Sequence, residues 1–347
     1  MTDIVFAKAP LRMALAGGGT DLEPYWSKYG GVVLNATIDQ YAYCKIEPCV
    51  CNHEKCWSFK SVDLGIEERH DFYSTPFMQG EYVDSDLQLL VNTYQYLTAK
   101  TDRHPVKITT YVEAPPGSGL GSSSALVVAL IAAIAEYHKI PLGEYDIAEY
   151  AVENERNICD MPGGKQDQFA AAFGGFNFTE FLTDGRTIVN PLRLNYKTQN
   201  MMELSTVLYY VGKPRSNSRV IENTAKGLVD SEVVLNATHK IKDACIDYKR
   251  SLLTGDFKRI SELMETYWKS KLETNPHVAS PEILDAYEYA LQNGATGAKI
   301  SGAGGGGHMV LFTEFERRHE LITALKEKEG RVVPFKFVKH GVDVWRQ

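Results

Sequence analysis

Residues 115–137 of the chain have the sequence PPGSGLGSSSALVVALIAAIAEY, in which a loop of glycine and serine leads directly into an apolar segment. The apolar part, 125–137, is hydrophobic nearly all round, which predicts a buried helix. In the preceding residues 106–113, apolar and polar side chains alternate, which predicts a half-buried strand. The sequence therefore predicts a strand, a tight glycine-rich loop and a buried helix in immediate succession.

The predicted loop has the chemistry of a phosphate site. Glycine lets the backbone approach an anion closely, and the first turn of a helix offers unpaired N–H groups and the positive end of its dipole. The hydroxyls of Ser122, Ser123 and Ser124 add groups that suit phosphate or magnesium. The alternative is a structural loop with serine helix caps, and from this segment alone the two interpretations are nearly even.

Two common nucleotide motifs do not fit this loop. A Walker loop ends in Gly-Lys-Ser/Thr, and no lysine stands at the start of the predicted helix. The dinucleotide fingerprint is G-x-G-x-x-G, whereas residues 117–122 are G-S-G-L-G-S. This difference disfavours a nucleotide-sugar dehydrogenase.

A second glycine-rich segment, ISGAGGGGHMV at 300–310, favours the phosphate-site interpretation. Five of the six residues 302–307 are glycine, which is entropically costly unless the backbone must pass close to something. We expect this loop to cover a nucleotide or to close against the first loop. A surface linker is disfavoured because a predicted helix and an apolar strand flank the segment, and His308 is expected to serve packing rather than catalysis.

Five charged side chains are candidates for chemistry. Asp167 suits a base or an orienting carboxylate for a hydroxyl nucleophile, and Glu155 suits a magnesium ligand, with Glu153 as its competitor. Arg12 lies on the predicted first strand, a few residues before Gly17-Gly18-Gly19, and could stabilise transferring phosphoryl charge. Asp21 could bind sugar hydroxyls. Without further information, an exposed helical charge is the favoured interpretation of Glu155, and Arg12 and Asp21 are only a strand charge and a turn residue. The alternative for Asp167 is a helix N-terminal carboxylate stabilised by the helix dipole.

Length and composition limit the class of protein. A chain of 347 residues is long for one hydrophobic core and suits two domains. A net charge of -7 disfavours a broad nucleic-acid surface. The sequence contains no apolar run of about 18 residues and no secretory leader pattern, which predicts a cytoplasmic protein without membrane partners.

The cysteines do not predict a metal site. Four of them, Cys44, Cys49, Cys51 and Cys56, fall close together with His53, but no C-x-x-C spacing is present. Reduced thiols in a strand and loop are the expected state, because disulfides are rare in the cytosol.

The rest of the chain predicts alternating helices and strands. Residues 206–211 (TVLYYV) predict a buried strand, and Ser280-Pro281 predicts the start of a helix with a serine cap. Further helices are expected over 86–99, 144–158 and much of 219–272, and further strands over 31–46 and 309–312. The pattern resets near Pro191, which predicts a domain boundary there.

Three segments together resemble the motifs of the GHMP kinases, a family that includes galactokinase, homoserine kinase and mevalonate kinase. APLRMALAGGGTD at 9–21 resembles their first motif, PPGSGLGSSSA at 115–125 their second, phosphate-binding motif, and KISGAGGGGHM at 299–309 their third. The resemblance implies an α+β fold of two domains. The first, 1–190, would resemble ribosomal protein S5 domain 2 and bind ATP, and the second, 191–347, would be ferredoxin-like.

The resemblance also implies roles for particular residues. Asp167 and Arg12 would be catalytic, and Mg²⁺ would be held by Ser124, with Ser123 as the second choice, together with Glu155. The phosphates of ATP would lie on Pro116, Gly117, Ser118, Gly119, Leu120, Gly121, Ser122, Ser123 and Ser124. The sugar substrate would contact Lys8, Gly18, Gly19, Thr20, Asp21, Gln166, Gly304 and Gly305.

A narrower similarity concerns the substrate. Three segments together are similar to the bacterial D-glycero-D-manno-heptose 7-phosphate kinases, a branch of this family. They are the first motif, YGGVVLNATID at 29–39, and PGGKQDQFAAAFGG at 162–175. It implies phosphorylation of the anomeric hydroxyl to give the 1,7-bisphosphate for GDP-heptose and surface polysaccharide. Alternatives are a fucose, arabinose or glucuronic acid 1-kinase and a non-catalytic sugar sensor on the same fold. The oligomeric state, a homodimer included, is left open.

A substrate that already carries a phosphate needs a basic anchor. Lys213, Arg215, Ser216, Ser218 and Arg219 follow the predicted strand at 206–211 and lead into a helix. Arginine forms bidentate contacts with phosphate, and a helix start adds N–H donors. A solvated basic turn explains the segment equally well.

Overall fold

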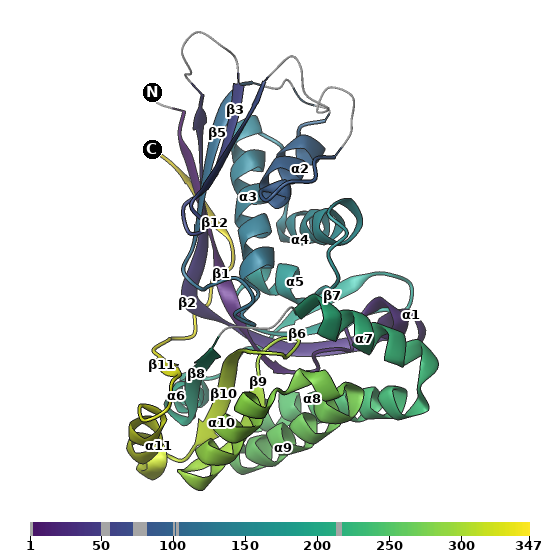
Figure 1. Cartoon of the computed structure of the whole chain (residues 1–347), viewed down its shortest axis with the longest axis vertical. Coiled ribbons are helices and arrows are strands. Elements are labelled where there is room, and N and C mark those ends of the chain that lie inside the picture. Colours follow the sequence, from purple (N-terminus) through teal and green to yellow (C-terminus); the bar gives the residue numbers. More distant parts are fainter. Residues whose placement is uncertain (1–2, 50–55, 72–81, 100, 102–103, 213–216) are drawn as a thin grey trace.

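The apolar segment of the opening motif forms α3 (Ser122–His138), the central helix of the first of two units stacked along the longest axis of the molecule (Figure 1). A computed structural model describes residues 3–49, 56–71, 82–99, 101, 104–212 and 217–347. Twelve residues of α3 are buried, including all of Val127–Ala135. The helix is buried because it has no polar face to turn toward water.

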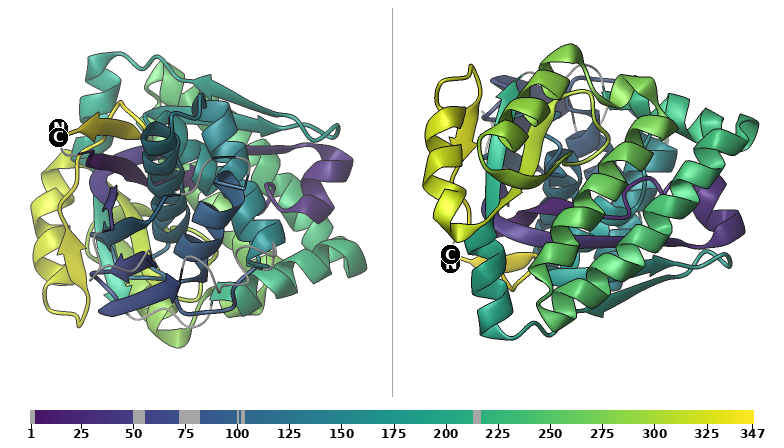
Figure 2. Two further views of the ribbon diagram at one scale, coloured as in Figure 1. Left: turned by 90° about the horizontal axis from the view of Figure 1, so that it is seen from above. Right: turned by 90° about the horizontal axis from the view of Figure 1, so that it is seen from below.

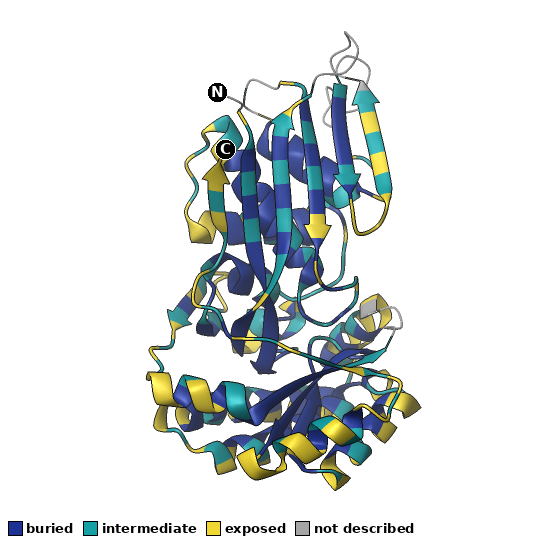
Figure 3. Ribbon diagram, turned by 90° about the vertical axis from the view of Figure 1, so that its left-hand side faces the viewer, coloured by how far each residue is buried: buried dark blue, intermediate teal, exposed yellow. Residues whose placement is uncertain are grey.

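One face of a mixed sheet packs against α3. The strand order is β12-β1-β2-β5-β3-β4, and β6 and β7 extend from β2. These strands are β1 (Val5–Ala16), β2 (Gly31–Pro48), β3 (Cys56–Ser61), β4 (Ile66–Asp71), β5 (Val106–Val112), β6 (Phe176–Phe181), β7 (Thr187–Pro191) and β12 (Asp343–Arg346). The opposite face of the sheet is open, and buried, intermediate and exposed residues alternate along its strands, as the two-residue side-chain period requires (Figure 3).

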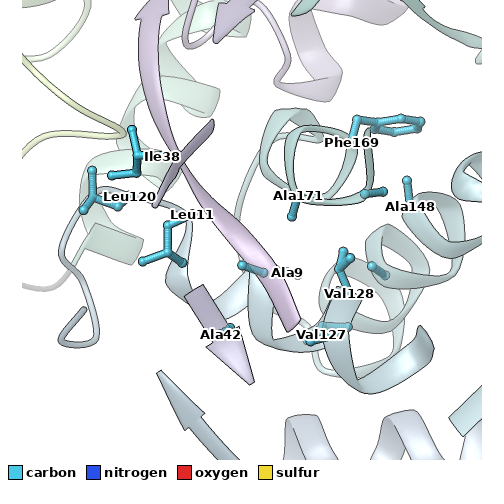
Figure 4. Close-up of a cluster of buried hydrophobic side chains, with 14 of the residues drawn as sticks. Ala9, Leu11, Ile38, Ala42, Leu120, Val127, Val128, Ala148, Phe169 and Ala171 are labelled. Carbon is cyan, nitrogen blue, oxygen red and sulfur yellow. The ribbon is translucent and has the colours of Figure 1, made fainter. Parts of the chain in front are cut away.

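The covering helices of this unit are α2 (Gln88–Leu97), α3, α4 (Glu144–Glu153) and α5 (Gln166–Phe173), while α1 (Glu23–Tyr29) lies at the end of β1. Figure 4 shows Ala9 and Leu11 of β1 in one buried cluster with Val127 and Val128 of α3. Small residues on β1 and α5 let these elements pack closely against α3. This close packing fixes the positions of β1 and α5 relative to the loop that precedes α3.

The second unit is an antiparallel sheet of order β11-β8-β10-β9 covered by helices. Its strands β8 (Thr206–Gly212), β9 (Ala295–Ile300), β10 (Gly307–Thr313) and β11 (Arg331–Val333) alternate with helices in the β-α-β-β-α-β succession of a ferredoxin-like unit. The helices are α6 (Tyr196–Ser205), α7 (Asn217–Asp230), α8 (Glu232–Thr254), α9 (Phe257–Thr274), α10 (Pro281–Gln292) and α11 (Arg318–Leu325). The view from below shows α8 and α9 side by side across this unit (Figure 2).

The division of the chain after residue 190 stays a prediction, with one difference at its far end. The predicted second domain runs to residue 347, but β12 leaves that unit and pairs with β1 of the first sheet, with Val5 opposite Arg346. No helix in the described part of the chain is both long and apolar enough to cross a membrane.

Candidate active site

A cleft of about 270 Å³ lies where the first loop, the start of α5 and the helices of the second unit meet, and we call it the central cleft. Segments far apart in the sequence line it. Its lining includes Arg12, Gly18, Gly19, Asp21, Gly117, Gly119, Gly121, Ser122, Ser123, Ser124, Glu155, Arg156, Gly164, Gln166, Asp167, Ser218, Thr224, Lys271, Gly302 and Ala303.

Arg12 and Asp167 form a bidentate ion pair at the wall of the central cleft. The Nε and Nη2 groups of Arg12 each donate to a carboxylate oxygen of Asp167 at 2.7 Å, and Nη1 donates to the carbonyl oxygen of Gly119 at 2.5 Å. Arg12 is only 3% exposed, whereas the side chain of Asp167 is 22% exposed. The pair therefore fixes the carboxylate while leaving part of it open to the cleft.

Backbone conformation explains the glycines of the first loop. Gly117, Gly119 and Gly121 have φ angles of 70°, 77° and 73°, a region that L side chains rarely adopt. A Cβ atom on Gly121 would also lie 3.3 Å from the carboxyl group of Asp167. Glycine thus lets the loop pass directly beside the carboxylate.

The N-terminus of α3 opens into the same cleft. No side chain caps this helix, and the three residues of its first turn, Ser122–Ser124, line the cleft. Uncapped N–H groups and the positive end of the dipole of a 17-residue helix make a site suited to phosphate.

Glu155 is a buried carboxylate beside that helix start. It lies in a π-helical turn (Asn154–Ile158) after α4, an irregularity frequent at functional sites, and it is 2% exposed. Ser123 donates to its Oε1 at 3.0 Å, and the amide of Gln168 donates to its Oε2. Among the described residues Glu155 has no lysine or arginine partner. A buried anion without a cation partner fits a metal ion, and the hydroxyl beside it belongs to Ser123 rather than Ser124.

The second glycine-rich loop closes against the first. His308 donates from its backbone N–H and from Nδ1 to the carbonyl oxygen of Ser118 at 2.9 and 2.7 Å, and Ser301 Oγ donates to Gly119 at 2.8 Å. His308 is 1% exposed, and burial lowers its pKa to about 4, so the ring is neutral at pH 7. These contacts give His308 a packing role, as expected from the sequence.

The opposite wall of the cleft centres on Asp21, which is 3% exposed. Its Oδ1 accepts from Gly19 N at 3.0 Å, and its Oδ2 accepts from the backbone and side-chain nitrogens of Gln166 at 3.3 and 3.1 Å. Arg156 donates to the carbonyl oxygens of Met161 and Gly164 and so holds the turn before α5. A Cβ atom on Gly164 would lie 1.9 Å from Asp21, so only glycine allows this contact.

Several predicted site residues do not line the central cleft. Lys8 lies on the exposed part of β1, over the ring of Tyr41 and 3.8 Å from Asp343. It is four residues before Arg12, roughly 13 Å along an extended strand. Thr20 is fully buried and bonds the backbone of Gly17 and Val32.

The remaining differences lie in the glycine loops and at the start of α7. Pro116 is exposed, while Ser118 and Leu120 are buried in the loop interior. Gly304 and Gly305 pack against Val278, and Gly302 and Ala303 line the cleft instead. Arg219 is exposed and does not line the cleft, Ser218 does, and Lys213, Arg215 and Ser216 lie outside the described residues.

The second unit contributes residues that were not predicted from the sequence, among them Lys271, Tyr267 and Lys299. Lys271 lines the cleft, and Tyr267 and Lys299 lie behind it, with Lys299 Nζ 4.7 Å from the ring centre of Tyr267. Burial, together with the charges of Lys271 and Arg12, lowers the pKa of Lys299 to about 7. In the sequence these residues stand only in amphipathic segments. Lysines that face water stand in segments of the same kind, so the sequence could not single these out.

Comparison with known proteins agrees with this geometry. Residues 88–175 match the GHMP kinases N terminal domain, and residues 248–331 match the GHMP kinases C terminal domain. The chain is 39% identical to a D-glycero-alpha-D-manno-heptose 7-phosphate kinase from Campylobacter jejuni, over 98% of both chains.

Solved structures are similar over the whole chain. A D-glycero-D-manno-heptose 1-phosphate kinase from Bacteroides thetaiotaomicron has a TM-score of 0.81 and 35% identity, covering 99% of both chains. A putative sugar kinase from Campylobacter jejuni has a TM-score of 0.79 and 37% identity, covering 100% of this chain and 99% of that one.

Proposed function

Because the chain belongs to the GHMP kinase family and is a kinase, we propose that it transfers the γ-phosphoryl group of ATP to the anomeric hydroxyl of D-glycero-D-manno-heptose 7-phosphate. The product would be the 1,7-bisphosphate, for GDP-heptose and surface polysaccharide, and we place the reaction in the cytoplasm, where ATP is available. The relative at 39% identity supports a sugar phosphate as substrate. The two heptose kinases are named for different phosphate positions, so the acceptor hydroxyl needs its own test.

One observation carries the proposal: the carboxylate of Asp167, held by Arg12, lies in the same cleft as the uncapped N-terminus of α3. With the phosphates of ATP on the first loop and α3, the terminal phosphoryl group would point toward Asp167. Asp167 would accept a hydrogen bond from the attacking hydroxyl and orient it. Phosphoryl transfer has a loose transition state, so positioning and charge neutralisation supply most of the catalysis. Arg12 is near enough to share in that neutralisation.

Magnesium would be held by Glu155 and Ser123. Ser123 replaces Ser124 in this proposal because its hydroxyl is the one that contacts Glu155. When bound, Mg²⁺ neutralises charge on the phosphates of ATP. Gln168, which donates to the other oxygen of Glu155, would keep the carboxylate oriented toward the cleft.

The direct test measures ADP release with heptose 7-phosphate, heptose 1-phosphate, unphosphorylated heptose, fucose, arabinose and glucuronic acid. We expect fastest turnover of heptose 7-phosphate, and a product whose ³¹P signal couples to the anomeric proton. Faster turnover of fucose would support the other 1-kinases. An absence of product with every sugar, in a protein that binds ATP, would support the non-catalytic sensor.

Substitution of Asp167 tests the proposed mechanism. Asp167→Asn should lower kcat by about 10²- to 10⁴-fold, because the amide cannot accept the proton, while the Kd for ATP changes little. Asp184→Asn is the matched control, since Asp184 lies on an exposed turn and pairs with Arg186. Wild-type kcat in a folded Asp167→Asn protein would reject the assigned role.

A further inference from the structure

Lys271 has an unusual environment for a lysine near the end of a helix. It lies in the last turn of α9 and is only 6% exposed. Its ammonium group donates one long hydrogen bond, 3.4 Å, to the carbonyl oxygen of Gly18. It forms no ion pair with a carboxylate of the described chain. Burying a cation with so little compensation is costly, so an anionic partner is expected.

The other cations that line the central cleft are already engaged. Arg12 is bound to Asp167 and Gly119, and all three nitrogens of Arg156 donate to backbone carbonyl groups. Lys271 is the remaining lysine or arginine of the described cleft lining, and two of its three donors have no protein acceptor. A ligand anion in this part of the cleft would therefore meet Lys271.

The hydrogen bonds give the order of groups along the cleft. Gln166 directly precedes Asp167 in the chain, and its side-chain amide donates to Asp21. Asp21 in turn accepts from the backbone of Gly19, and Lys271 Nζ lies 3.6 Å from the position that a Cβ atom on Gly19 would take. Asp167 and Lys271 are thus the first and last members of a row of polar groups that are joined by these contacts. The row suits a molecule with a reacting hydroxyl at one end and an anion at the other.

The middle of this row has a free acceptor. The Oε1 atom of Gln166 is buried and has no hydrogen-bond partner among the described residues, although Gln166 lines the cleft. A buried amide oxygen without a donor is costly, and a sugar hydroxyl would satisfy it. The polar groups between Asp167 and Lys271 are therefore compatible with a ring of hydroxyls.

The start of α7 is held beside Lys271. Asn275, the residue that ends α9, donates to the carbonyl oxygen of Val220 at 3.0 Å and to Thr224 Oγ1 at 3.4 Å. Ser218, one turn earlier on α7, lines the same cleft. The end of α9 and the first turns of α7 thus form one wall, which can offer a phosphate both the ammonium group and a hydroxyl.

We propose that Lys271 binds the phosphate group already present on the sugar substrate, at the end of the molecule remote from Asp167. This inference rests on the proposed function, because it assigns a residue to the phosphate of that substrate. It places the anchor on α9, whereas the sequence suggested the basic segment 213–219. Burial lowers the pKa of the Lys271 ammonium and the charge of Asp21 raises it, and a bound phosphate would favour the charged form further.

The test compares phosphorylated and unphosphorylated heptose as substrates of Lys271→Met. We expect kcat/KM for heptose 7-phosphate to fall by about 10- to 100-fold, mainly through KM, because a charge-assisted contact is lost. The preference for the phosphorylated over the unphosphorylated sugar should fall by a similar factor. Lys269→Met is the matched control, since Lys269 is on the same helix, 70% exposed, and pairs with Glu265.

The outcomes separate the two proposals. If wild-type protein phosphorylates no heptose phosphate, the proposed function fails. If wild-type protein is active and Lys271→Met loses equal activity on both sugars, Lys271 does not read the phosphate and this inference is overturned. If the variant does not fold, inorganic phosphate provides the test on wild-type protein at saturating ATP. Competition with heptose 7-phosphate supports the anchor, and inhibition that is not competitive with the sugar rejects it.

Discussion

At the scale of single residues, the cleft depends on charges whose partners fix their direction. The guanidinium group of Arg12 donates to Asp167 along one edge and to the carbonyl oxygen of Gly119 along another. These bonds keep the carboxylate from rotating away from the cleft. Glu155 is oriented instead by two neutral donors, Ser123 and Gln168. This contrast leaves the charge of Glu155 available to a cation, whereas that of Asp167 is already balanced.

The difference predicts that Glu155→Gln changes the magnesium requirement of the enzyme. The Mg²⁺ concentration for half-maximal activity should rise at least about 10-fold, because the amide removes the negative ligand. A magnesium titration at fixed ATP measures this. Glu153→Gln is the control, since Glu153 is two residues earlier and bonds Asn157 at an exposed position. A larger effect at Glu153 than at Glu155 would transfer the metal role to Glu153.

Some residues of the cleft could be predicted from the sequence and others could not. Arg12, Asp167 and Glu155 lie in or near recognisable motifs, and the structure brings all three into one cleft. Lys271 could not be predicted, because a lysine on an amphipathic helix has the same local sequence whether it faces water or a cleft. Its burial depends on the contact of α9 with Gly18, about 250 residues earlier in the chain.

At the scale of elements, the two glycine-rich loops behave as one interlocked piece. Each loop has a position where the other leaves no room for a side chain. A Cβ atom on Gly119 would lie 2.4 Å from Ser301 O, and one on Gly307 would lie 2.4 Å from Ser118 O. The second loop therefore supports the shape of the first rather than forming a separate flap.

Gly119→Ala should accordingly cost more than an ordinary glycine substitution. We expect a loss of about 3 kcal/mol in the free energy of unfolding, from strain at positive φ and from the collision with Ser301, together with weaker ATP binding. Gly185→Ala separates the two causes, because Gly185 has a φ of 92° but nothing within 4 Å of its Cβ position. Urea unfolding of both variants measures the difference. Equal losses would mean that the collision is relieved elsewhere.

Elements were predicted better than their contacts. The periodic segments at 106–113, 125–137 and 206–211 correspond to β5, α3 and β8, and Ser280 caps α10 as expected, accepting from Ile283 N. The predicted helix over 144–158 ends instead in a π-helical turn that carries Glu155. The hydrophobic pattern of the sequence does not predict this irregularity. A π-helical turn inserts one extra residue and so shifts the directions of the side chains, but the residue types are those of an ordinary helix.

At the scale of the whole molecule, the two units share a continuous apolar core. Cys245 and Tyr248 of α8 and Met264 of α9 pack with residues of β1 and β2 in one buried cluster. The cleft lies beside this contact, with the first loop on one unit and Lys271 on the other. A tightly packed interface of this kind holds the two walls at a fixed separation.

The strand β12 is a further connection between the units. Removal of residues 342–347 should lower Tm by about 5 °C, because β1 loses one of its two neighbouring strands and Phe6 loses its stacking contact with Trp345. Arg346→Gln is the control. It keeps the strand but removes the exposed ion pairs with Asp3 and Glu136, which should cost less than about 1 kcal/mol. Thermal melts of the truncated protein and of Arg346→Gln, each compared with the wild-type protein, check this. A truncated protein with the Tm of the wild type would show that β12 adds no stability.

The pairing of β12 with β1 also orders events during synthesis. β1 is made long before β12, because Val5 and its partner Arg346 are 341 residues apart in the chain. Until β12 has been made, that edge of β1 has no strand of the described structure beside it, although α3 and β2 are already available. Closure of the first sheet at this edge therefore waits for β12, and until then the open edge can pair with other chains.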